Sequence, residues 1–166
     1  MGVAGKGENM QGAWSCACAV AMFIVLSMAA TGNAAQGNDG PVHYRVMNGA
    51  IPAPLTDRPG DPERGRRIVL DREGGDCIIC HAMPLPQRQF HGTVGPPLDG
   101  VGNRYTAGEL RLRIADPKAI HPETIMPAYY KVEGLHRVPD RYHGKPILTA
   151  QQIEDVVAYL LTLRSE

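Results

Sequence analysis

The chain has 166 residues, 17 basic and 17 acidic side chains, and a formal net charge of zero, so it is one modest domain. The neutral balance excludes a protein that binds nucleic acid or an acidic membrane surface mainly through charge. Aromatic residues make up only 5% of the chain, against 19 glycines and 14 prolines, and we therefore expect something besides side chains to fill the core.

An apolar run at residues 13–30 predicts an export signal. It is preceded by Lys6 and followed by small residues through Ala35, an order typical of secretory signal peptides. An uncleaved membrane anchor is the alternative, but it needs about 20 strongly apolar residues and this run is broken by serines. We expect residues 1–34 to be removed and the mature protein to be periplasmic, with no membrane anchor after cleavage.

Cleavage changes the cysteine count. Cys16 and Cys18 lie in the export signal, so the mature chain keeps only Cys77 and Cys80. Two disulfides or a four-thiolate zinc site, which four cysteines would allow, are then excluded.

After the signal, residues 35–59 are expected to form a proline-rich extension and residues 60–166 the main domain. Asp61-Pro62-Glu63 predicts a helix start, because it combines an N-cap, a proline at the first helical position and an early acid. Gly65 would allow close approach of a second helix that crosses this one. The arginines beside it are interpreted as a solvated face.

Residues 75–81, Gly-Asp-Cys-Ile-Ile-Cys-His, contain C-x-x-C-H, the attachment signature of c-type haem. Two thiols three positions apart on a helical turn can each add across one vinyl group of a porphyrin, and the next residue then points its imidazole at the iron. Cys77 and Cys80 are expected to form thioethers and His81 to be the proximal ligand. Other interpretations are a thioredoxin-like site, which would lie near a βαβ pattern that we do not find, a disulfide, and half of a zinc site.

Gly95-Pro96-Pro97-Leu98 follows about fifteen residues after His81. A ligating histidine normally donates its second ring N–H to a carbonyl, and proline holds a carbonyl rigidly. We expect Pro96 to play this part toward His81; an ordinary rigid turn is the alternative.

Two further helices are predicted downstream. Thr106 to Glu109 form a capping box, and Pro117 ends the helix that follows. Thr149 and Gln152 form a second capping box ahead of a C-terminal helix. An apolar stripe runs along that helix at i, i+3, i+4, i+7 and i+8, formed by Ile153, Val156, Val157, Leu160 and Leu161.

The sixth iron ligand is predicted to be Met126. Pro127 stiffens its loop, whereas Met83 lies too near His81 to reach the opposite face. A buried, gap-filling methionine is the alternative interpretation, and His121 is the nearest competitor as a ligand. The remaining histidines are interpreted as solvated loop residues. The other candidates are therefore Met47, His43, His91, His136 and His143.

The order of these features resembles class I cytochrome c over nearly all of residues 60–165. The resemblance implies an all-α fold, rich in loops, with helices around one covalently bound haem c. Finer details resemble the SoxX family, the monohaem subunits of the SoxAX complexes of bacterial sulfur oxidation. The resembling stretches are residues 60–66, 94–102, 110–114, 122–130, 144–149 and the arm 51–56.

The SoxX resemblance implies an electron-accepting subunit of an L-cysteine S-thiosulfotransferase, which couples thiosulfate oxidatively to a cysteine of the carrier SoxYZ. Its partners would be a SoxA-type monohaem or dihaem subunit in a heterodimer, SoxYZ transiently, and a downstream cytochrome. No catalytic residue is expected here, because both mature cysteines are committed to haem and sulfur chemistry must occur on the partner. Residues 51–55 are expected to clasp that partner beside the haem edge.

Two other functions remain open from the sequence. One is a free periplasmic electron shuttle, and the other is a gas-binding or sensing haem protein with an open sixth position. His121 is a departure from the family pattern, in which asparagine is expected before Pro122, so it leaves open a competition with Met126 for the iron.

Overall fold

The computed structural model describes residues 1–2, 41–86 and 88–165. Beyond its first two residues, the predicted export signal of residues 1–34 lies outside the described residues, and the domain boundaries stay a prediction. Within the described ranges, the secondary structure is helical, with no β-strand, which confirms the all-α fold. None of the helices in these ranges has the length and apolar character that crossing a membrane requires.

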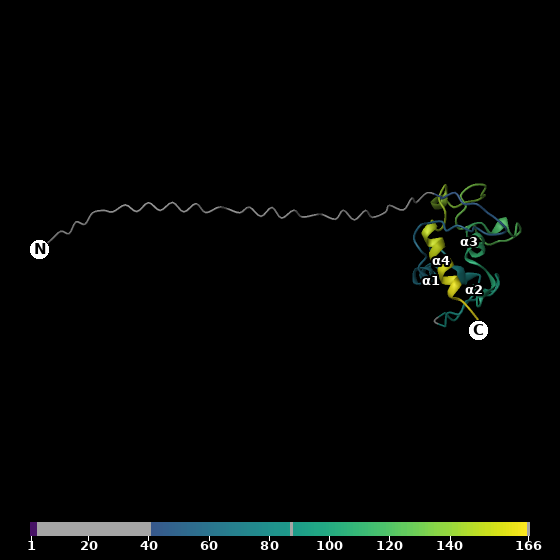
Figure 1. Ribbon diagram of the computed structural model, residues 1–166, viewed down its shortest axis with the longest axis horizontal. Helices are drawn as coiled ribbons and strands as arrows, with labels where there is room; N and C mark the ends of the chain where they lie inside the picture. Colours follow the sequence, from purple (N-terminus) through teal and green to yellow (C-terminus); the bar gives the residue numbers. More distant parts are fainter. Residues whose placement is uncertain (3–40, 87, 166) are drawn as a thin grey trace. The chain divides into compact units, whose positions relative to one another are not determined.

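Three helices form where the sequence predicted them (Figure 1): α1 spans Pro62–Leu70, α3 spans Ala107–Ala115 and α4 spans Ala150–Thr162. The predicted caps are present, because the Asp61 carboxylate accepts from the N–H groups at the start of α1 and capping boxes open α3 and α4. The shorter elements are α2 (Val101–Arg104) and the 3-10 turns η1 (Cys77–Ile79), η2 (Pro117–Ala119) and η3 (Asp140–Tyr142).

The core forms around α4, which packs on α1, α2 and α3. The predicted crossing of α1 and α4 is confirmed at Gly65, where an added Cβ would overlap the carbonyl oxygen of Asp155 and lie 2.8 Å from Cβ of Tyr159. The absence of a side chain therefore lets the two backbones touch. Most of the predicted apolar stripe of α4 is buried: Ile153, Val156, Val157 and Leu160.

The arm before α1 packs against the same core through Ile51 and Leu55, whereas residues 52–54 between them are exposed, so the clasp predicted for residues 51–55 stays a prediction that only residues 52–54 could fulfil. Ile51 is 1% exposed and Leu55 is 5% exposed, and both backbones are tied down. The N–H of Ile51 donates to the Gly108 carbonyl at 2.9 Å, and that of Leu55 donates to a Glu154 carboxylate oxygen at 2.8 Å. Their apolar side chains contact this chain's own interior and are not available to a partner.

A buried ion pair anchors the arm. Arg111 of α3 is 4% exposed and Glu154 of α4 is 6% exposed. Two parallel hydrogen bonds of 2.7 and 2.8 Å join them, and a third from Arg111 reaches the carbonyl of Ile51 at 2.6 Å. Bidentate geometry and the satisfied backbone partners offset the cost of taking two charges out of water.

The neighbouring carboxylate, Asp155, pairs with Arg64 at 2.8 Å. The sequence indicated that the arginines beside Gly65 form a solvated face. Arg64 departs from this, because it is paired with Asp155 even though 44% of its side chain is exposed. Burial opposes ionisation of Asp155, but hydrogen bonds from Arg64, the Asp61 N–H and Gln151 outweigh it and lower the pKa of this carboxyl group.

This lowered pKa predicts a pH dependence of stability. A carboxyl group whose pKa is lower in the folded state than in the unfolded state stabilises the fold when it is ionised. This contribution is complete at pH values above the unfolded-state pKa of about 3.9, and it is lost as the pH falls through the folded-state pKa. We expect Asp155→Asn to lower the free energy of unfolding at neutral pH by about 1–3 kcal/mol. Denaturant titrations at several pH values measure this difference. The free energies of unfolding of the variant and the parent should converge once the pH falls below the folded-state pKa of Asp155. A difference that stays the same at every pH would contradict the role of the ionised Asp155 carboxylate.

Candidate functional site

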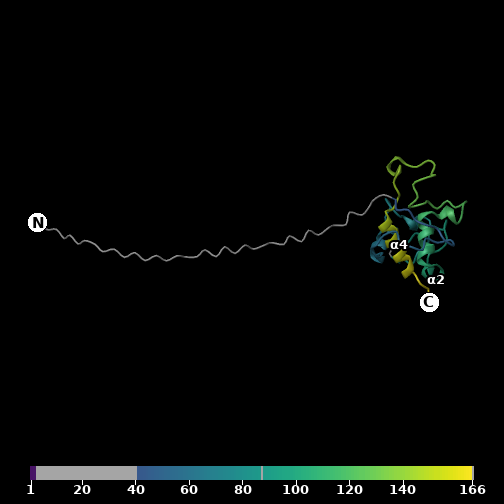
Figure 2. The same cartoon turned by 45° about the horizontal axis from the view of Figure 1, so that its top comes forward.

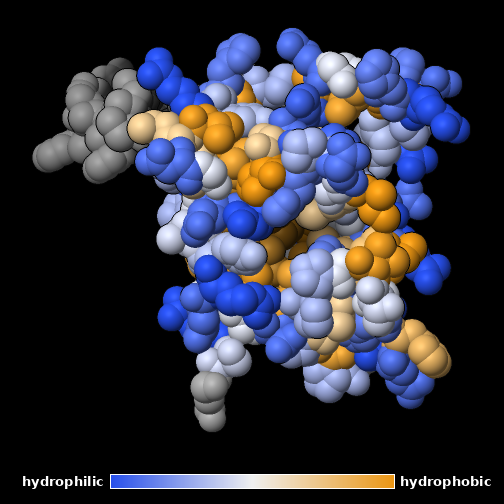
Figure 3. Space-filling view, turned by 90° about the vertical axis from the view of Figure 1, so that its right-hand side faces the viewer, coloured by the Kyte–Doolittle hydropathy of each residue, from blue (hydrophilic) through white to orange (hydrophobic). Residues whose placement is uncertain are grey.

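A cavity of about 370 Å³ lies between the C-x-x-C-H segment and the loop that carries Met126. This volume is typical of sites for small molecules and cofactors. On the face shown in Figure 3 the molecule is hollowed, and apolar side chains gather in and around the hollow. Apolar residues of the G-P-x-L segment and of α2, α3 and α4 line the cavity: Leu98, Val101, Leu110, Ile114, Val156 and Leu160.

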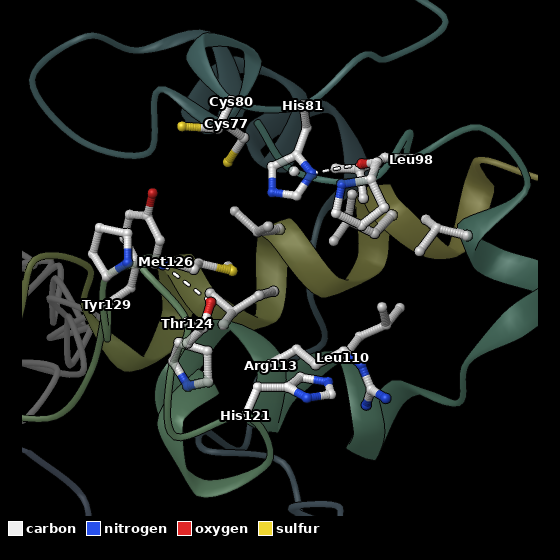
Figure 4. Close-up of a pocket in the computed structure, with 18 of the residues that line it drawn as sticks. Cys77, Cys80, His81, Leu98, Leu110, Arg113, His121, Thr124, Met126 and Tyr129 are labelled. Carbon is white, nitrogen blue, oxygen red and sulfur yellow. Dashed lines mark hydrogen bonds between the residues drawn. The ribbon is translucent and has the colours of Figure 1, made fainter. Parts of the chain in front are cut away.

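The predicted attachment segment lines one side of the cavity (Figure 4). Cys77 opens the 3-10 turn η1, and its carbonyl accepts from the N–H groups of Cys80 at 3.2 Å and His81 at 2.9 Å. This turn brings both thiols and the imidazole to the same cavity. The preceding residue, Asp76, has a left-handed backbone with φ of 38°, which turns the chain into η1.

The ring of His81 is held by the segment predicted for that purpose. Its Nδ1 lies 2.7 Å from the carbonyl oxygen of Pro96. Because a carbonyl oxygen only accepts, Nδ1 must carry the hydrogen, and the lone pair is left on Nε2. An added Cβ on Gly95 would lie 2.6 Å from Nδ1, so only glycine leaves the ring its space. Arg104 supports the segment by donating to the Pro97 carbonyl at 2.8 Å.

Met126 faces this segment from the other side of the cavity, and Figure 4 shows its thioether directed inward. Its loop is braced by Lys118, whose ammonium donates to the carbonyls of Pro122 at 3.2 Å and Thr124 at 2.6 Å. His121 lines the same cavity but is exposed. The other candidate methionines and histidines do not line it: Met47, Met83, His43, His91, His136 and His143.

The environment of Cys77 disfavours a thioredoxin-like site. Burial, and then the charge of Asp76, raise the pKa of its thiol to about 12. Cysteines that exchange disulfides need a lowered pKa, since the thiolate is the reactive form. No disulfide joins Cys77 to Cys80. The protonated thiol of Cys77 is therefore poorly suited to redox exchange.

Three further residues of the cavity wall were not predicted from the sequence. Arg113 lies over the ring of Tyr105, 3.9 Å from its centroid, and both line the cavity. Tyr129 lines it beside the C-x-x-C-H segment. Arg113 could have been found, because it follows Leu110 by three residues and so shares the apolar face of α3. No local pattern marks Tyr105 or Tyr129.

The residues present fit a covalently held haem. Two thiols and an imidazole with a free Nε2 line one side, a thioether faces them, and the walls between are apolar. The space that Gly95 leaves at the imidazole and the guanidinium groups of Arg104 and Arg113 at the cavity wall are consistent with a group that combines an apolar ring and carboxylates.

Comparison with known proteins places these features in context. Residues 62–164 match the family model described as cytochrome c. The fold is similar to a chain of the crystal structure of SoxXA from P. pantotrophus, with a TM-score of 0.70 and 46% sequence identity. That match covers 76% of this chain and 98% of the other. A search of curated proteins finds no match.

Proposed function

Because the chain belongs to the cytochrome c family, as a SoxX-type cytochrome with covalently bound haem c, we propose that it is the electron-accepting subunit of a thiosulfate-coupling complex. The complex would join thiosulfate oxidatively to a cysteine of a SoxYZ-type carrier. The observation that carries this proposal is the 46% identity with a chain of SoxXA over 98% of that chain's length. Because the match covers 76% of this chain, the similarity extends over the helical domain and the loops that surround the site.

In this proposal Cys77 and Cys80 hold the haem through thioethers, and His81 and Met126 provide the axial ligands. Pro96 fixes the tautomer of His81 by accepting the hydrogen from Nδ1, at the observed separation of 2.7 Å. When bound, the haem supplies a one-electron couple whose potential is raised by a methionine and histidine ligand pair. Outside the axial pair, Arg104 and Arg113 offer cationic groups at the cavity wall.

The cysteine count restricts what this subunit does. Removal of residues 1–34 would leave only Cys77 and Cys80, and both are committed to the haem. No thiolate of the mature chain is then left to carry a sulfur intermediate, so we assign the sulfur chemistry to a SoxA-type partner. Electrons would pass on to a downstream cytochrome, and export would place these steps in the periplasm.

Co-purification tests this function. The tagged protein, isolated from cells grown on thiosulfate and stained for haem after denaturing electrophoresis, should bring down a second haem protein whose iron has a cysteine ligand. A monomer that carries haem but retains no such partner would contradict the subunit assignment and support a free electron shuttle.

Replacing the proposed sixth ligand tests the site. Met126→Ala is expected to open the iron to carbon monoxide, so that the reduced variant binds the gas readily while the parent resists it. Optical titration of both proteins with carbon monoxide measures the difference. His121→Ala is the matched control from the same loop and should behave as the parent does. Equal binding by Met126→Ala and the parent would show that the methionine is not the ligand.

A further inference from the structure

One side chain joins the two segments that face each other across the cavity. The hydroxyl of Tyr129 donates to the carbonyl of Gly75 at 2.8 Å, across 54 positions of sequence. Tyr129 follows Met126 by three residues, and Gly75 precedes Cys77 by two. Figure 4 shows the hydroxyl directed toward the C-x-x-C-H segment. In the described part of the chain, this is the only hydrogen bond between residues 75–81 and residues 121–130.

Both ends of this bond are fixed by backbone contacts. The N–H of Tyr129 donates to the Ile114 carbonyl in α3 at 3.1 Å, and its own carbonyl accepts from Leu148, just before α4, at 2.9 Å. Gly75 is buried, and the N–H of the next residue donates to the Asp71 carbonyl at the end of α1 at 2.9 Å. The hydroxyl therefore connects two anchored points, not two mobile ones.

The loop that carries Met126 has only local support between its ends. The N–H of Met126 donates to the Thr124 hydroxyl at 3.2 Å, which shapes the loop but does not place it relative to His81. Lys118 braces the first half of the loop, as described above. At the far end, the bond from Tyr129 is what relates the loop to the attachment segment.

We propose that Tyr129 is a positioning residue for the iron ligand: its bond to Gly75 holds the Met126 loop at the separation from His81 that ligation by both residues requires. This inference rests on the proposed His81 and Met126 ligand pair. A neutral thioether is a weaker ligand than an imidazole, so its binding depends strongly on being held in place beforehand.

The test uses the haem-loaded protein and imidazole as a competing ligand. Tyr129→Phe removes the hydroxyl and keeps the ring. We expect the affinity of the oxidised protein for imidazole to rise about threefold to tenfold, as follows from the usual contribution of one hydrogen bond. Optical titration with imidazole gives the dissociation constants, and thermal unfolding of the same samples measures any general loss of stability.

Tyr142→Phe is a matched control. Its hydroxyl donates to the Glu73 carbonyl at 3.1 Å, two residues from Gly75, but Tyr142 lies outside the Met126 loop. Its loss should leave the imidazole affinity unchanged. Equal shifts in the two variants, or an unchanged affinity in Tyr129→Phe, would overturn the positioning role.

Met126→Ala separates this inference from the proposal on which it rests. If Met126 is the ligand, this variant binds imidazole far more tightly than the parent, whatever Tyr129 does. A parent that already binds imidazole as tightly as Met126→Ala would refute the ligand pair itself. A parent and a Tyr129→Phe variant that bind equally, and both more weakly than Met126→Ala, would refute only the role of Tyr129.

Discussion

A Cys77→Ala/Cys80→Ala double variant is expected to lose covalent haem and, with it, the ordered fold. An empty cavity of about 370 Å³ corresponds to a loss of at most about 9 kcal/mol at roughly 24 cal/mol per Å³. This free-energy loss is an upper bound because the cavity opens to solvent. Domains of this size are stable by only about 5–15 kcal/mol, so a loss near this upper figure would remove most of the stability, and we expect a large unfolded fraction.

Haem staining after denaturation and near-ultraviolet circular dichroism measure the two losses. The single variants Cys77→Ala and Cys80→Ala are the controls, because each keeps one thioether and should retain more structure than the double variant. A double variant that is free of haem but unfolds as cooperatively as the parent would show that the side chains fill this core by themselves.

Arg111→Leu is expected to lower the free energy of unfolding by about 3–5 kcal/mol, the usual cost of leaving one member of a buried ion pair without its partner. Glu154, which is 6% exposed, would lose its guanidinium partner, and the carbonyl of Ile51 would lose its hydrogen bond. The arm should then detach more easily. Denaturant titration measures the loss in free energy of unfolding. Faster proteolysis within residues 41–59 would show that the arm detaches.

Arg64→Leu is the matched control, because its partner Asp155 directly follows Glu154 in α4 while 44% of the Arg64 side chain is exposed. We expect a loss of about 1 kcal/mol or less from this partly solvated pair. Equal losses from the two variants would contradict the claim that burial makes the Arg111 pair critical. The haem spectrum of the folded fraction should be unchanged in both.

The helices that the sequence predicts are those specified locally. Asp61, Thr106 and Thr149 cap α1, α3 and α4, and each cap acts within one turn of its helix. The helix α2 was not predicted because no side chain caps it: it follows Gly100 in a left-handed conformation, and the N–H of Gly102 donates to the distant Leu163 carbonyl at 2.9 Å. Tertiary contacts, not local signals, form that element.

The burial of Ile51 and Leu55 in the arm was not predicted, for the same reason. Ile51 and Leu55 stand among prolines and resemble an exposed linker. The side chains that hydrogen-bond to their backbones, Arg111 and Glu154, lie 60 and 99 positions away, respectively. Nothing in the arm's own residues indicates this. A pattern of two apolar residues four apart is too short to distinguish a core contact from a docking segment.

The attachment motif of the site was predictable and its cross-cavity contacts were not. Cys77, Cys80 and His81 lie within five residues, so their spacing alone indicates their chemistry. The contact of His81 with Pro96 follows from what a ligating imidazole needs. The bond from Tyr129 to Gly75 joins positions 54 apart and becomes visible only when the fold brings the two loops together.

The proton NMR spectrum of the reduced, haem-loaded protein tests the axial pair most directly. A methionine methyl group held over the face of a porphyrin is shifted strongly upfield by the ring current. We expect one such three-proton signal in the parent, absent from Met126→Ala and retained in His121→Ala. A parent spectrum without this signal, or a signal that persists in Met126→Ala, would contradict ligation of the iron by Met126.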